Sequence, residues 1–213
     1  MRSDVKGGAA MDPRADAAIR SAAVIRKISV PPVMAALLVA VLAAFRRNVV
    51  STWSDLLLSL LFLSLLPAAA YPLSELIPSV RRRGREGQRD LAFVLSLASY
   101  TAAWCLGILG GMSGGLAMIC TVYFFSVLIL LLFNKALGLR ASGHACSVTG
   151  PIIMACVYFG GWGALAGLPL YAAIFWASLH SGRHTAKELL LGTAACEAAY
   201  LLALGFCRLT GII

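Results

Sequence analysis

The sequence predicts an all-α fold, a polytopic bundle of six to seven transmembrane helices. Of the 213 residues, 60% are hydrophobic and 13% are charged, whereas soluble domains average about 45–50% apolar and 25% charged residues. The mean hydropathy is +0.86, and apolar runs fill nearly everything from Val30 onward. Many runs approach the ~20 residues that a helix needs to cross a bilayer. One helical bundle therefore leaves no room for a folded soluble domain.

Seven apolar segments follow one another along the chain, with polar or glycine-containing stretches between them. They cover about residues 30–45, 55–78, 91–110, 115–133, 144–161, 164–179 and 186–207. Each is near the length of a membrane crossing. The first is short and begins with Pro31 and Pro32, so six crossings plus one re-entrant or interfacial helix is the alternative.

Residues 1–29 form a basic, Ala-rich tail, and residues 30–213 form the transmembrane domain. The first apolar segment ends at Arg46 and Arg47 without a small-residue cleavage site, so we interpret it as an uncleaved helix rather than a signal peptide. The tail is expected either to lie as an amphipathic helix on anionic lipid or to be disordered.

The charge pattern predicts membrane lipids, and no nucleic acid, as partners. The 18 Lys and Arg residues outnumber the 9 Asp and Glu residues, but they lie in the tail and in loops beside apolar segments. The loops at 110–115 and 160–163 carry no charge. The positive-inside rule therefore places the tail, the 81–90 loop and the loops that contain Arg140 and Arg183 on the cytoplasmic face. We interpret the Arg81–Arg89 run as a determinant of topology and headgroup contact.

The six cysteines lie within or at the edges of apolar segments, with no CxxC pair. Neither disulfides nor a zinc site is expected from this distribution.

Two of the three histidines, His144 and His184, stand in short charged loops that each open onto an apolar segment. The alternation of charge predicts both loops on one face. Glu188 follows His184 by four residues, which puts both on one side of a helix. A carboxylate that accepts a hydrogen bond from one imidazole nitrogen fixes the tautomer and makes the other nitrogen more nucleophilic. His184 is therefore the candidate nucleophile.

The other loop contains Ser142, Gly143 and His144. Its small residues allow close backbone approach, and the exposed N-terminus of the following helix favours an anion. His144 is the candidate acid. Phosphoryl transfer also needs cations for the charge on the equatorial oxygens. The available cations are Lys135, Arg140 and Arg183. This scheme requires no metal ion and no cofactor.

These motifs resemble those of the type 2 phosphatidic acid phosphatase superfamily, in particular its small bacterial membrane members, over roughly Pro72 to Leu204. The family pattern has a Lys/Arg segment that binds phosphate and a Pro-Ser-Gly-His segment. It ends with a Ser-Arg segment, then His after five intervening residues, and Asp four residues after that His. Here Ala141-Ser-Gly-His144 is similar to the second segment.

The third segment of the family resembles the stretch from Trp176 to Gly192, and the first is reduced to Lys135 and Arg140. Two positions depart from the pattern. Ser178 stands where the family has its phosphate-binding arginine, six residues before His184, and Glu188 stands where the family has Asp.

The resemblance implies a lipid phosphate phosphatase that acts on phosphatidate or an isoprenyl (di)phosphate. His184 would become a phosphohistidine, His144 would protonate the leaving alkoxide, and Glu188 would orient His184. The phosphate-binding groups would be Lys135, Arg140, Arg183, Ser142 and Gly143. The implied location is the bacterial cytoplasmic (inner) membrane, with the site on the outer face, which is opposite to the side that the charge count predicts.

Two alternatives stay open at the level of sequence. Ser178 and the reduced Lys/Arg segment also fit a non-enzymatic protein that binds lipid phosphates on the same scaffold. A transporter would use His180, His184 and Glu197 as a proton relay, because a carboxylate deep in an apolar segment usually has a function. The sequence leaves the oligomeric state open.

Overall fold

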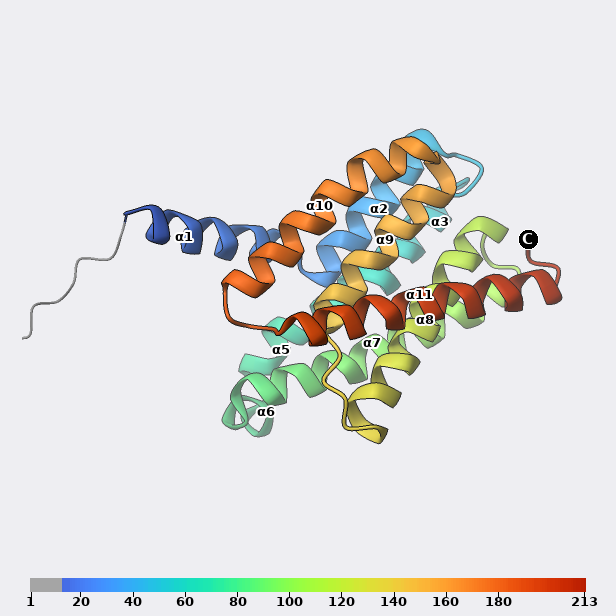
Figure 1. Ribbon diagram of the computed structural model, residues 1–213. Helices are drawn as coiled ribbons and strands as arrows, with labels where there is room; N and C mark the ends of the chain where they lie inside the picture. The colour runs from blue at the N-terminus through green and yellow to red at the C-terminus, as the bar shows by residue number, and fades with distance from the viewer. Residues whose placement is uncertain (1–12) are drawn as a thin grey trace, which may run out of the picture.

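The computed structural model describes residues 13–213, and all of the regular structure in that range is helical (Figure 1). The first twelve residues of the predicted tail lie outside this range. Within the range, the rest of the tail forms α1 (Pro13–Ile28), which packs against α10 (Gly161–His180). The second half of the predicted tail is therefore helical and packs against a helix of the bundle.

A bend of 62° separates α1 from α2 (Pro31–Phe45), the first predicted apolar segment. The bend follows from Pro31, because the residue before a proline avoids helical backbone angles. Val30 accordingly adopts an extended conformation, with φ −62° and ψ 149°. The end of α1 thus turns across the start of α2 and reaches α9 (Gly143–Phe159), through a contact between Ser29 and His144.

The second predicted segment is one continuous span, Trp53–Leu76. It consists of α3 (Trp53–Leu60), a π-helical turn (Leu61–Leu65), α4 (Leu66–Ala68) and α5 (Ala70–Leu76). Pro67 lacks the N–H that would continue the α-helical hydrogen bonds, and a wider turn just before it accommodates this loss. The short helix α6 (Pro78–Arg82) then leads into α7 (Gly84–Ile108).

The remaining helices carry the two histidine loops. A π-helical turn (Leu132–Ala136) extends α8 (Gly114–Leu131), and residues 137–142 connect it to α9. Only Gly160, with φ +59°, separates α9 from α10. The two helices pack closely, since a Cβ on Gly163 would lie 2.2 Å from the carbonyl oxygen of Ala155. The last helix, α11 (Ala186–Leu209), begins just after His184.

The core of the bundle forms around α8, which packs against α7 and α11. Its residues Leu116, Ile119 and Val122 are almost fully buried, as is Leu42 of α2. Because lipid tails are as apolar as leucine, such contacts stabilise a membrane bundle through close packing rather than through the hydrophobic effect.

The predicted all-α membrane bundle is confirmed. Five helical spans in residues 13–213 are long and apolar enough to cross a membrane, and the bent pair α1–α2 would make six. The seven predicted segments are all helical, but α2 and α9 have 15 and 17 residues, fewer than the ~20 of a full crossing. The span surfaces expose large apolar side chains, as lipid contact requires, for example Leu57, Leu65, Val94, Leu165, Leu168 and Leu201.

Candidate functional site

A cavity of about 560 Å³ opens where the bend after α1 meets the ends of α7, α8, α9 and the loop before α11. We call it the cationic cavity. Both histidines of the sequence motifs, His144 and His184, line it. Five arginines line it as well: Arg26, Arg85, Arg89, Arg140 and Arg183. No Asp or Glu of the described residues is among its lining, so the lining carries a net positive charge.

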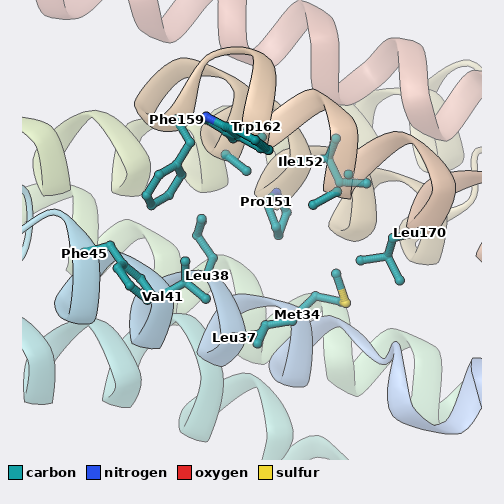
Figure 2. A pocket seen from close by; sticks show the side chains of 14 residues that line it. Met34, Leu37, Leu38, Val41, Phe45, Pro151, Ile152, Phe159, Trp162 and Leu170 are labelled. Carbon is teal, nitrogen blue, oxygen red and sulfur yellow. The ribbon is translucent and has the colours of Figure 1, made fainter.

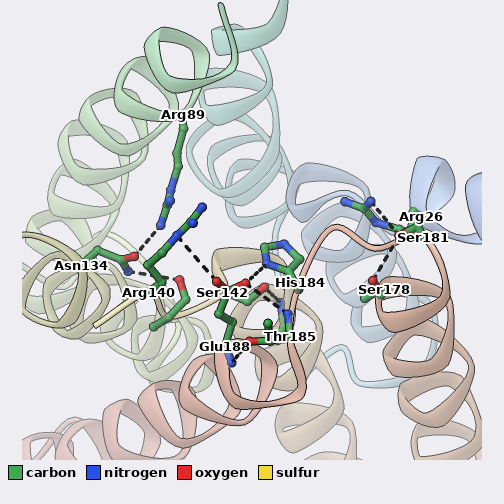
Figure 3. Close-up of polar contacts among 12 residues, drawn as sticks. Arg26, Arg89, Asn134, Arg140, Ser142, Ser178, Ser181, His184, Thr185 and Glu188 are labelled. Carbon is green, nitrogen blue, oxygen red and sulfur yellow. Dashed lines mark hydrogen bonds and ion pairs between the residues drawn. The ribbon is translucent and has the colours of Figure 1, made fainter. Parts of the chain in front are cut away.

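His184 is held by the capping of α11. Thr185 is the N-cap residue, and its hydroxyl accepts a hydrogen bond from the backbone N–H of Glu188. The Glu188 carboxylate accepts a reciprocal bond from the N–H of Thr185, which completes a capping box. The same carboxylate oxygen lies 3.1 Å from Nδ1 of His184 (Figure 3). Nε2 of His184 has no hydrogen-bond partner among the described residues.

His144 occupies the first turn of α9, and Ser142 is the N-cap residue of that helix. The Ser142 hydroxyl accepts from the N–H of Ala145, and the Ser142 N–H donates to the carbonyl oxygen of Glu188 at 2.9 Å. A backbone hydrogen bond therefore joins the start of α9 directly to the first turn of α11. On its other side, Nε2 of His144 lies 3.2 Å from the hydroxyl of Ser29.

The predicted cations separate into two groups. Arg140 and Arg183 line the cavity, and Nε of Arg140 lies 3.6 Å from the free oxygen of Glu188 (Figure 3). Lys135 is not part of the lining; its Nζ forms an ion pair with Asp90 at 2.9 Å. Arg83 contacts the other oxygen of the same carboxylate. The structure therefore does not bring Lys135 together with the histidines.

The remaining predicted residues lie close to the histidines. Gly143 lines the cavity. Ser142 is buried and is not part of the lining; it caps the start of α9. Ser178, at the position where the resemblance predicts an arginine, is fully buried on α10, and its hydroxyl has no partner among the described residues.

Two residues that the sequence allowed for a proton relay do not line the cavity. His180 is exposed and stacks on Trp176, with ring centroids 5.1 Å apart. Glu197 is exposed on the outer side of α11 and is not part of the lining.

Sequence reasoning missed the contribution of α7. The Arg81–Arg89 run was interpreted as a topology determinant, yet Arg85 and Arg89 point into the cavity, where Arg89 also donates to Asn134. A signal was present in the spacing. Arg85, Arg89, Phe93, Ser96 and Tyr100 recur every three or four residues, the period of one helical face, and all five line the cavity.

The electrostatics of the cavity favour a neutral His184. Burial lowers the pKa of its imidazole below the usual 6.5, and the charges of Arg26 and Arg89 lower it further. The hydrogen bond and the negative charge of Glu188 act in the opposite direction without reversing the net shift. A neutral imidazole with Nδ1 held by a carboxylate has its Nε2 lone pair available for nucleophilic attack.

A second cavity, of about 410 Å³, lies between α2, α9 and α10 and is lined almost entirely by apolar side chains (Figure 2). We call it the apolar groove. Met34, Leu38 and Ile152 are among its walls, and Pro151 borders both the groove and the cationic cavity. Pro151 is therefore the lining residue that the apolar groove and the cationic cavity share.

Comparison of the chain with models of protein families, with curated proteins and with solved structures finds no match. Among residues 13–213, no group of three or more His, Cys, Asp or Glu side chains is arranged to hold a metal ion.

Proposed function

We propose that this protein is a membrane-embedded phosphatase that hydrolyses a lipid phosphate at the bilayer surface. The observation that carries the proposal is the cationic cavity, in which two histidines and five arginines meet while Glu188 holds Nδ1 of His184. Cations and an activated nucleophile are what displacement at phosphorus needs. The motifs that resemble the type 2 phosphatidic acid phosphatase superfamily support the same reaction.

In the proposed reaction, Nε2 of His184 attacks phosphorus, so that an N–P bond forms while the P–O bond to the lipid breaks. His144 donates a proton to the departing alkoxide oxygen from its protonated form. Burial and the charge of Arg26 lower the pKa of its imidazole to about 4, so this role requires the negative charge of the bound phosphate to raise that pKa. Water then attacks the phosphohistidine and gives a proton back to His144, so the N–P bond breaks, inorganic phosphate is released and both histidines are restored. The arginines neutralise the charge on the phosphoryl oxygens in both steps.

The apolar groove supports a lipid as the substrate. Because Pro151 borders both spaces, a headgroup in the cationic cavity leaves the groove within reach of its hydrocarbon chain. Phosphatidate and isoprenyl (di)phosphates both combine an anionic head with such a chain. The proposed location is the bacterial cytoplasmic membrane.

The test is phosphate release from a panel of these lipids in detergent micelles with EDTA present. We expect turnover by the wild type, a loss of about 10³-fold or more in His184→Ala, and a loss of about 10²–10⁴-fold in His144→Ala. His180→Ala is the matched control and should retain turnover, since His180 is exposed and does not line the cavity. A folded, monodisperse wild type that releases no phosphate would contradict the proposal.

A second candidate is a non-enzymatic protein that binds lipid phosphates in the same cavity. Ser178 favours it, because a buried serine stands where the resemblance predicts a phosphate-binding arginine. Binding of the lipids without turnover by the wild type would support this candidate over the first.

A further inference from the structure

The last turn of α1 and the bend that follows it form one wall of the cationic cavity. Arg26, Val30 and Pro31 all line it, although they come from the border of the segment that the sequence presents as a tail. The bend before α2 and the packing of α1 against α10 bring this turn into place. Ser29, with its hydroxyl 3.2 Å from Nε2 of His144, ties the same turn to α9.

Arg26 is held at one end of its guanidinium only. Its Nη1 donates to the hydroxyl of Ser181 at 3.1 Å, and that hydroxyl donates in turn to the carbonyl oxygen of Ser178 (Figure 3). Nε of Arg26 is buried and has no hydrogen-bond partner among the side chains and backbone groups that the structure describes. A guanidinium has five N–H donors, so one contact leaves most of them unused beside the cavity.

A buried donor without an acceptor is costly, because it loses its hydration without a replacement. A guanidinium also matches the oxygens of a phosphate group in a bidentate arrangement. At this point the end of α10 offers the buried Ser178, which stands where the resemblance predicts an arginine, and its C-cap residue Ser181. A phosphate group would supply the acceptor that Arg26 lacks, and Arg26 would supply the positive charge that Ser178 does not.

We propose that Arg26 binds the phosphate group of the ligand, and that α1 is a structural part of the binding site rather than a surface anchor. The proposal rests on the proposed function for the identity of the ligand as a phosphate ester. Binding of phosphate by Arg26 does not require turnover, so the role of Arg26 can be tested separately from the phosphatase activity.

The test measures binding of inorganic phosphate to the full-length protein in detergent, together with turnover of a lipid phosphate. Arg26→Ala should weaken phosphate binding by about 10- to 100-fold, the range for loss of a hydrogen bond to a charged group. Arg26→Lys should weaken it less, since the charge remains and the bidentate geometry is lost. Arg20→Ala is the matched control, because Arg20 lies exposed on the same helix and outside the cavity lining.

Ser181→Ala separates ligand binding from a role as a structural strut. It removes the contact that anchors Arg26 to α10 and leaves the guanidinium in the chain, so we expect only a small loss of phosphate binding. An equal loss in Ser181→Ala and Arg26→Ala would show that the contact is structural and would overturn the proposal. The thermal unfolding midpoint of each variant, measured without phosphate, shows whether that variant folds. If Arg26→Ala fails to fold, phosphate binding by Arg26→Lys is compared with phosphate binding by Ser181→Ala instead.

The outcomes distinguish this proposal from the proposed function. Phosphate binding that is lost in Arg26→Ala, in a wild type without turnover, would support the role of Arg26 and contradict the phosphatase. Turnover and phosphate binding that are both unchanged in Arg26→Ala would overturn the role of Arg26 and leave the phosphatase in place.

Discussion

Glu188 is the residue on which the local geometry of the site depends. One of its oxygens contacts Nδ1 of His184 at 3.1 Å and caps the start of α11, while the other lies 3.6 Å from Nε of Arg140. A single carboxylate thus fixes the histidine ring, ends the loop and holds a cation nearby. Neutralising it should affect all three contacts.

Glu188→Gln should move the acidic limb of the pH profile to lower pH. The proposed nucleophile is neutral His184, and burial already places the pKa of its imidazole below 6.5, so the acidic limb of kcat/KM should lie below that value. The charge of Glu188 raises this pKa. Removing this charge lowers the pKa of His184 further, so the acidic limb of kcat/KM should move to lower pH. We also expect kcat to fall about tenfold or more through lost orientation.

The pH profile of kcat/KM in wild type and variant checks this prediction. Thr185→Ala is the control, because it removes a capping hydroxyl and keeps the carboxylate beside His184. A limb that moves to higher pH in Glu188→Gln would show that Glu188 does not act on His184 in this way.

Some of the residue-scale geometry could be predicted from the sequence and some could not. The spacing of four residues between His184 and Glu188 predicted their contact, which is present although His184 lies just before the N-cap of α11 rather than in the helix. No pattern in the sequence around Arg26 indicates a role in the site, because the residues that surround it in the cavity are distant in the chain. The separation of Lys135 from the site depends on Asp90, which is 45 residues away.

At the scale of elements, close packing between α9 and α11 joins the two halves of the site. Gly192 on α11 makes this possible, because a Cβ there would lie 2.2 Å from the carbonyl oxygen of Ser142. The N–H of Ser142 meanwhile donates to the carbonyl oxygen of Glu188. The start of α9, which carries His144, is therefore fixed against the start of α11, which carries Glu188.

Gly192→Ala should displace the start of α9 and destabilise the protein by about 1–3 kcal/mol, the usual cost of overpacking. Phosphate release should fall with it. Gly205→Ala on the same helix is the matched control, because a Cβ there meets nothing within 4 Å, and alanine favours a helix by up to about 1 kcal/mol over glycine. Thermal unfolding in detergent compares the two, and equal midpoints would show that Gly192 is not required for the packing.

The seven apolar segments could be found from hydropathy because helices that face lipid must be apolar along most of their length. The position of α1 could not be found in this way. Its placement depends on the extended backbone at Val30 and on packing against α10, a helix more than 130 residues further along the chain. The face of α7 that lines the cavity was also hidden, because its arginines fit a topology signal equally well.

At the scale of the whole molecule, cations from distant parts of the chain gather at one end of the bundle. The alternation of charged and uncharged loops predicted that the loops of His144 and His184 share a face, and both histidines line one cavity. The five arginines of that cavity come from α1, from α7 and from the two loops. Because these arginines line a cavity, their positions need not reflect membrane topology alone. The number of positive charges in each loop is therefore a weaker indicator of which side of the membrane the loop faces.

The central claim is that His184 accepts the phosphoryl group, and the most direct measurement is trapping of that intermediate. A radiolabelled lipid phosphate is mixed with the protein and quenched in alkali during the first turnover. We predict an alkali-stable, acid-labile label on the wild type and on His180→Ala, and none on His184→Ala. Turnover without any labelled protein, or a label that persists in His184→Ala, would contradict the account.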